Sequence, residues 1–125
     1  MKKSKKKKLL ETTQYCFLSG EPIIRPKDLT REHYCPKSKL PLSIASEPYN
    51  IKPAIKIINN IKGDLFPCEW EEQKIGRVYN AIINYNLDNY ERALLSLVLE
   101  KYKIQGKRDV CPLCVLHKLK LCNER

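Results

Sequence analysis

The chain has 125 residues, a formal net charge of +10 and an isoelectric point near 9.4. This length suits one compact domain, or a very small domain with a helical appendage, and it excludes a large enzyme with a deep multi-domain cleft. The excess of positive charge predicts an anionic partner, and nucleic acid is the commonest such partner of an intracellular protein.

The first segment in chain order, residues 1–10, is rich in lysine. Its like charges repel one another and it offers little to bury, which predicts a disordered basic tail. Two leucines precede a polar stretch, too few for a signal peptide, and no run of about twenty apolar residues would span a membrane. We therefore expect a reducing cytoplasmic location, away from membranes. The lysines expected to contact nucleic acid are Lys5, Lys6, Lys7 and Lys8.

Short apolar and β-branched pieces follow over residues 13–29, broken by a Ser-Gly step and two prolines. This pattern predicts short strands or a hairpin, and residues 30–35 can continue as a strand. Three prolines and three serines then predict a loop over residues 36–49.

Three helices are predicted after this loop. In the first, Pro53 suits the opening turn, apolar residues recur on one face, and Gly63 suits the end. Asn59 then lies far from the apolar face, one turn before Lys62. Two longer helices are expected over residues 69–85 and 88–104 from their apolar periodicity. The apolar positions are Trp70, Ile75, Val78, Tyr79, Ile82 and Ile83 in one, and Leu94, Leu95, Leu97, Val98, Leu99 and Tyr102 in the other.

An acid and a histidine stand side by side at Glu32 and His33, followed by Asn50, Asn59 and a Lys-Gly step. Cleaving a phosphodiester requires an activated water and a cation on the phosphate. His33 has a suitable pKa to take a proton from water near neutral pH. Glu32 and the side-chain oxygen of Asn59 are hard donors of the kind that Mg²⁺ or Mn²⁺ prefers.

Over Cys16 to Pro67, this pattern resembles the HNH endonuclease family in its H-N-N variant. The resemblance implies an α+β fold, with a ββα-metal core over residues 11–67 and a helical extension over residues 68–125. It also implies metal-dependent cleavage of DNA. The implied roles are metal binding by Glu32 and Asn59, general base for His33, positioning of the loop or the imidazole by Asn50, and nucleic-acid contact by Lys37 and Lys62.

Many members of that family carry a zinc site built from two CxxC pairs around the core. Here the first pair reads Cys16 and Ser19, and the positions of the second pair are Ile55 and Ile58. Three of four ligands are therefore missing. We expect this zinc site to be absent and Cys16 to be a buried apolar residue.

The extension ends in CPLCVLHKLKLC, a turn leading into a short helix. A CPxC turn can point two thiolates at one ion, so Cys111 and Cys114 are predicted to bind a structural Zn²⁺. The further ligands stay open among His117, Cys16 and Cys68, and Cys122 could join only if the final helix is broken. Two other functions also stay open: a non-catalytic binding module for nucleic acid or ribonucleoprotein, and a toxin-type or phage packaging nuclease.

Overall fold

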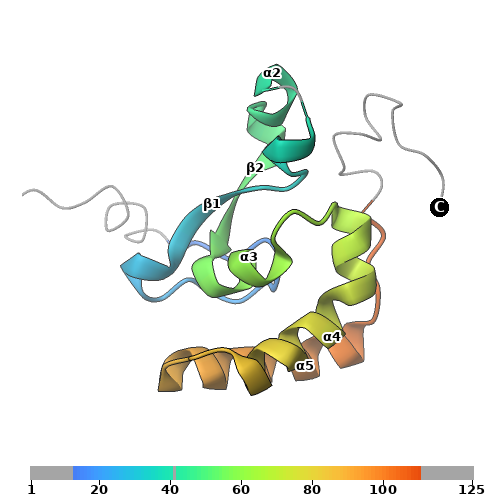
Figure 1. Cartoon of the computed structure of the whole chain (residues 1–125). Coiled ribbons are helices and arrows are strands. Elements are labelled where there is room, and N and C mark those ends of the chain that lie inside the picture. Colours follow the sequence, from blue (N-terminus) through green and yellow to red (C-terminus); the bar gives the residue numbers. More distant parts are fainter. Residues whose placement is uncertain (1–12, 41, 111–125) are drawn as a thin grey trace, which may run out of the picture.

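The computed structural model describes residues 13–40 and 42–110 of the chain (Figure 1). The predicted basic tail, with Lys5 to Lys8, lies outside the described residues, and so do Cys111 and Cys114. Within the described part a two-stranded antiparallel sheet is combined with helices, so the fold is α+β. No helix in this part combines the length and hydrophobicity that crossing a bilayer would require.

The sheet leads directly into a helix. A short 3₁₀ turn, η1 (Pro26–Asp28), precedes β1 (Leu29–His33), which pairs antiparallel with β2 (Ile51–Ile55). Leu29 lies opposite Ile55 and His33 opposite Ile51. The helix α3 (Lys56–Lys62) follows β2 without a loop and packs against both strands. The chain thus forms a strand–strand–helix unit.

The connection between the strands is not the predicted loop. It contains three short helical pieces: η2 (Lys37–Lys39), α2 (Leu42–Ala45) and η3 (Pro48–Asn50). Pro36 immediately precedes η2, and Pro48 is the first residue of η3. Proline suits the first turn of a helix because the backbone N–H that it lacks would have no partner within the helix there. The prolines therefore begin short turns here, and pieces of three or four residues are too short to show a helical period.

The prediction that Pro53 opens the first turn of a helix is wrong. Pro53 lies in β2 opposite Arg31, and α3 begins three residues later. The carbonyl of Pro53 accepts a hydrogen bond from the backbone N–H of Phe17 at 2.9 Å. Because N–H and C=O of one strand residue point to the same side, the missing donor faces away from β1 and the ladder loses no bond.

The two long helices agree with the prediction to within two residues. They are α4 (Pro67–Asn84) and α5 (Asn89–Gln105), which pack side by side beneath α3 in Figure 1. Asp88 caps α5: its Oδ1 accepts from Glu91 N at 2.7 Å, and Glu91 Oε1 accepts from Asp88 N at 3.0 Å. This reciprocal pair satisfies two donors that a helix start leaves open.

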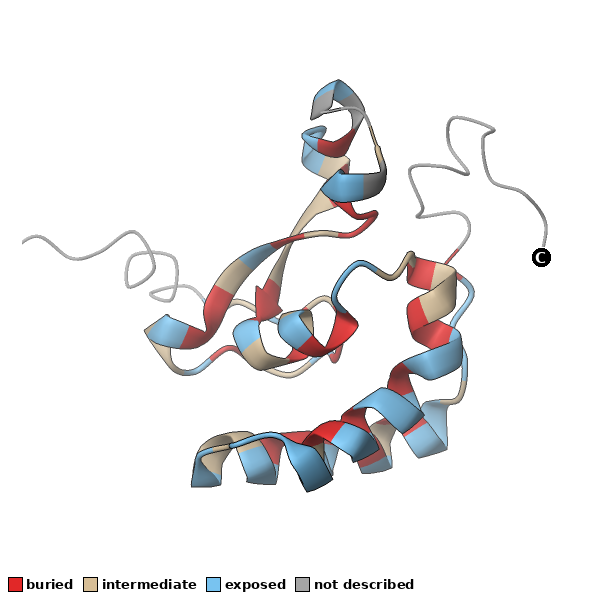
Figure 2. Ribbon diagram, in the orientation of Figure 1, coloured by how far each residue is buried: buried red, intermediate tan, exposed pale blue. Residues whose placement is uncertain are grey.

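One hydrophobic core joins the strand–strand–helix unit to the α4–α5 pair (Figure 2). Tyr102 of α5 donates from its hydroxyl to the carbonyl of Leu18 at 2.7 Å, which fixes the N-terminal segment on this core. The fully buried members include Leu18, Ala54, Ile55, Ile58, Trp70, Val78, Ala81, Leu95, Val98 and Tyr102.

The apolar positions of the long helices are only partly buried. Ile75, Tyr79 and Ile83 of α4 are exposed, at every fourth position along one face, and Leu97 of α5 is also exposed. α4 contacts α3 and α5 through other residues, so the face that carries Ile75, Tyr79 and Ile83 remains outside the core of the described residues.

Candidate active site

A groove of about 430 Å³ lies where the end of β1 faces α3. Glu32 and His33 reach it from the last two positions of β1, and Asn59 reaches it from the middle of α3. Three residues predicted to act together therefore line one surface. The other lining residues are Arg31, Pro36, Lys37, Asn60, Gly63 and Asp64.

Glu32 and His33 share the groove although they are consecutive in a strand. Regular alternation would point them to opposite faces of the sheet. His33 is the last residue of β1, where the chain leaves the regular strand. Glu32 is only 7% exposed and His33 is half-buried, so the carboxylate lies deeper in the groove than the imidazole.

The Glu32 carboxylate has an unusual electrostatic environment. Burial raises the pKa of Glu32 to about 7, although Lys62 and a hydrogen bond from the backbone N–H of His33 both favour the ionised form. The negative charge of Asp64 adds to the upward shift. Lys62 Nζ lies 3.9 Å from Glu32 Oε1. Near neutral pH this carboxyl is thus close to its titration midpoint, where an added cation would favour ionisation.

The Asn59 carboxamide lies directly against this carboxylate. With its nitrogen turned toward Glu32, Asn59 donates to Oε1 at 3.2 Å and also to Oε2. Half a turn of the amide would place its oxygen at the same position, so that oxygens of both residues would face one point. Such hard donors suit Mg²⁺ or Mn²⁺, and Mg²⁺ needs only one or two protein ligands because it keeps several waters.

The donor set fits a hydrated ion and not a cage made wholly of protein ligands. Within residues 13–40 and 42–110, no group of three or more His, Cys, Asp or Glu side chains is placed to hold one ion. Glu32 and Asn59 would therefore share the ion with water, which suits magnesium chemistry better than a structural zinc site.

The surroundings of the His33 imidazole favour its neutral form. Burial lowers the pKa of His33, and the positive charges of Lys37 and Lys62 lower it further. A neutral imidazole has one ring nitrogen that can accept a proton, which a general base requires.

Asn50 binds the backbone of the loop beyond β1. Its Oδ1 accepts from Cys35 N at 2.7 Å, and its Nδ2 donates to Cys35 O at 3.0 Å and to Ala45 O at 2.9 Å. Asn50 is 1% exposed, so these bonds lie out of water. Of the two positions expected for Asn50, beside the loop or beside the imidazole, these contacts match the loop.

The lysines predicted to contact nucleic acid have different positions. Lys37 is exposed at the groove. Lys62 is fully buried beside Glu32, which does not allow the expected direct contact with a phosphate in this conformation. Its burial follows from the carboxylate that meets it inside the fold, since a buried ammonium requires a partner of opposite charge.

Two charged residues that line the groove were not among the predicted site residues. Arg31 is two positions before His33, and strand alternation would have placed the two side chains on one face, so the sequence held a usable signal. Asp64 follows the turn at Gly63 and acts on Glu32 through its charge. Nothing in the local pattern indicated that it faces the groove.

Cys16 is a buried core residue, as predicted. It is 1% exposed, and its Sγ accepts a hydrogen bond from the backbone N–H of Ile55 at 3.2 Å. Ile55 and Ile58 belong to the same hydrophobic cluster. Cys16, Ile55 and Ile58 thus meet in one region of the hydrophobic core.

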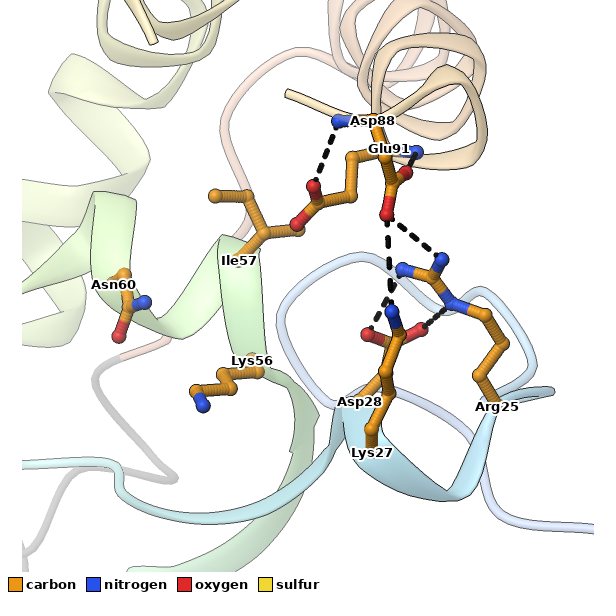
Figure 3. Close-up of a pocket in the computed structure, with 8 residues that line it drawn as sticks. All are labelled: Arg25, Lys27, Asp28, Lys56, Ile57, Asn60, Asp88 and Glu91. Carbon is orange, nitrogen blue, oxygen red and sulfur yellow. Dashed lines mark hydrogen bonds and ion pairs between the residues drawn. The ribbon is translucent and has the colours of Figure 1, made fainter. Parts of the chain in front are cut away.

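A second pocket, of about 230 Å³, lies between η1, α3 and the start of α5 (Figure 3). Arg25 crosses it: its Nε donates to Asp28 Oδ2 at 2.6 Å and its Nη1 donates to Asp88 Oδ2 at 3.0 Å. Glu91 is engaged in the cap of α5. Arg25 thus links Asp28 of η1 to Asp88 at the start of α5. We interpret these ion pairs as stabilising the fold and not as a binding site.

Comparisons of the chain with protein-family models, with curated proteins and with solved structures find no match.

Proposed function

We propose that this chain is a metal-dependent endonuclease with a ββα-metal core of the HNH type. The observation that carries the proposal is the meeting of Glu32, His33 and Asn59 in one groove, from β1 and α3. Sequence spacing suggested the three residues as a set, and the fold places them together. The hydrophobic core does not explain that meeting, because all three are polar side chains that line the groove.

In the proposed reaction, Glu32 and Asn59 would hold a hydrated Mg²⁺ or Mn²⁺ through their side-chain oxygens. When bound, such an ion supplies positive charge to the phosphate and the leaving oxygen. Neutral His33 accepts a proton from the attacking water, for which its lowered pKa keeps it available. Arg31 and Lys37, both exposed at the groove, attract the phosphate backbone.

Asn50 acts on this site through the backbone. Its three hydrogen bonds hold Cys35 and Ala45 in fixed positions, and Cys35 lies two residues after His33. These bonds restrain the loop that follows the imidazole. A general base must lie within hydrogen-bond reach of its water, so a fixed loop favours a fixed imidazole.

The packing of Cys16 supports the HNH-type core independently of the groove. In the resemblance, residues 16 and 55 are positions of two zinc-binding pairs that share one ion. Here Cys16 Sγ and Ile55 N are 3.2 Å apart. Two segments that such a zinc site would join are therefore in contact, with apolar side chains in place of the metal.

A second candidate function is nucleic-acid binding without cleavage, and Lys62 favours it. The buried ammonium already places a positive charge 3.9 Å from Glu32. A resident cation can neutralise the carboxylate and compete with a divalent ion. In this alternative the groove and the basic residues bind nucleic acid, and the carboxylate serves a structural ion pair.

Incubation with supercoiled plasmid DNA separates the two functions. The nuclease should produce nicked or linear DNA with Mg²⁺ or Mn²⁺ and none with EDTA. A parallel assay with a single-stranded RNA distinguishes the substrate class. Protein that shifts DNA in a gel but cuts neither nucleic acid with any divalent ion would contradict the nuclease and support the binding module.

A further inference from the structure

The lysines and arginines of the described chain divide into two groups by their contacts. Most lie against a carboxylate, a backbone carbonyl or an aromatic ring. This group comprises Arg25, Lys27, Lys52, Lys62, Lys74, Arg77, Arg92, Lys101, Lys103 and Arg108. Among the residues whose side chains the structure describes, Arg31, Lys37, Lys56 and Lys107 have none of these contacts. Positive charges that form no contact within the fold are available to an anionic partner.

Three of these four exposed side chains gather around α3 and β1. Arg31 and Lys37 line the groove of the candidate active site. Lys56, the first residue of α3, lines the neighbouring pocket drawn in Figure 3. Asn60 lines both the groove and this pocket, so the two adjoin on the surface of α3. Lys107 follows α5 and lines neither of them.

Lys56 takes no part in the ion pairs of that pocket. Arg25 links Asp28 to Asp88 there. In Figure 3 the Lys56 side chain extends away from these ion pairs, on the side of α3 where Asn60 lies. Residues four positions apart on a helix are neighbours on its surface, which agrees with this view. The ion pairs stabilise the fold, whereas the Lys56 ammonium is exposed beside the groove.

The residues of the candidate active site lie between Lys56 and Lys37. Lys56 precedes Asn59 by three positions on α3, so the two are surface neighbours with Cβ atoms about 5–6 Å apart. Lys37 begins η2, beyond the end of β1 at His33. Asp28, just before β1, lines the second pocket, and His33 lines the groove, so β1 runs from one to the other. Positive charges therefore lie on both sides of the site.

We propose that Lys37, Arg31 and Lys56 form a basic track that holds one DNA strand on both sides of the phosphate to be cleaved. The proposal rests on the proposed function, because the active-site residues lie within this track. From Leu29 to His33, β1 covers about 14 Å, since each step along a strand is about 3.4 Å. A DNA strand carries one phosphate for about each 3.4 Å of the duplex axis, so the track has room for about four phosphates. It therefore fits an internal stretch of a strand and not only a strand end.

The experiment measures the DNA affinity of the full chain in EDTA, where cleavage does not interfere. Fluorescence anisotropy of a short labelled DNA duplex gives the affinity over a range of salt concentrations. Lys56→Ala should reduce the slope of log K against log salt by about one, because one phosphate contact is lost. Lys56→Arg should keep the wild-type slope, since it keeps the charge. Lys107→Ala is the matched control: Lys107 is also exposed, but it lies outside the track, so the slope should not change.

Equal slopes for wild type and Lys56→Ala would overturn the track. An equal reduction in Lys107→Ala would also overturn it, because DNA affinity would then follow the net charge and not the position of the lysine. Wild-type protein that binds no DNA duplex would have the same consequence. Failure of the nuclease function gives a different result: a slope that depends on Lys56, without cleavage under any divalent ion, would support the track and reject the cleavage.

Discussion

Replacing Asn50 by alanine should cost far more stability than any other asparagine substitution near the groove. The change removes three hydrogen bonds and leaves Cys35 N–H and the carbonyls of Cys35 and Ala45 without this partner. A buried polar group left unsatisfied costs about 1–3 kcal/mol, but the three share one site and their costs do not add fully. We expect a loss of about 3–5 kcal/mol in the free energy of unfolding.

Urea denaturation followed by the fluorescence of buried Trp70 measures this loss. Asn60→Ala is the matched control: Asn60 is exposed on α3, so its replacement should change stability by less than about 0.5 kcal/mol. Asn50→Asp adds a pH test. Its second oxygen would face two carbonyls, so the folded state should favour the protonated acid, and stability should fall as pH rises. A loss below about 1 kcal/mol for Asn50→Ala would refute the reasoning.

Three other predictions concern the groove and the tail. The pKa of Glu32, raised to about 7, means that the folded state holds this proton more tightly than the unfolded chain. Stability should therefore fall as pH rises from about 5 to 8, by at most about 3 kcal/mol more in wild type than in Glu32→Gln. His33 acts in the opposite sense in both proteins, so equal slopes would contradict the assignment. Glu32→Ala and Asn59→Ala should lose cleavage but regain part of it at high Mn²⁺, and no recovery would argue against metal binding. Deleting residues 2–8 should flatten the slope of log K for DNA against log salt by up to about five, whereas an unchanged slope would assign the lysines to another partner.

The local patterns of the sequence predicted much of the fold. The helices α4 and α5 have long periodic faces and clear first-turn signals, such as the reciprocal bonds of Asp88 and Glu91. Their boundaries could therefore be predicted from neighbours in sequence. Exposed Tyr79 and Leu97 show the limit: periodicity identifies an apolar face, but it does not say which face another element will cover.

Pro53 shows why the start of α3 could not be predicted. Proline is compatible with the first turn of a helix and also with a strand position whose donor faces away from the partner strand. Only the contact between Pro53 O and Phe17 N, 36 residues earlier in the chain, distinguishes these positions. That contact depends on how the N-terminal segment folds onto the sheet.

In the candidate site, too, some features could be predicted from the sequence and others depend on contacts between distant segments. Spacing suggested Glu32, His33 and Asn59 as a set, and the structure brings them into one groove. The sequence spacing did not indicate that Lys62 is buried. A lysine can be buried when a carboxylate lies beside it, and here that carboxylate is Glu32, which is distant in sequence. The effect of Lys62 on metal binding at Glu32 therefore depends on the contact between these two side chains, which the motif does not show.

The most direct test of the nuclease function compares cleavage of one DNA substrate by wild type and by His33→Ala, both saturated with Mg²⁺ or Mn²⁺. The base is needed only when water attacks, so His33→Ala should abolish cleavage while its circular dichroism spectrum and DNA affinity stay close to wild type. Asn60→Ala, at an exposed position of the same groove, should cut at the wild-type rate. Wild-type cleavage matched by His33→Ala would contradict the assignment of His33 as the base.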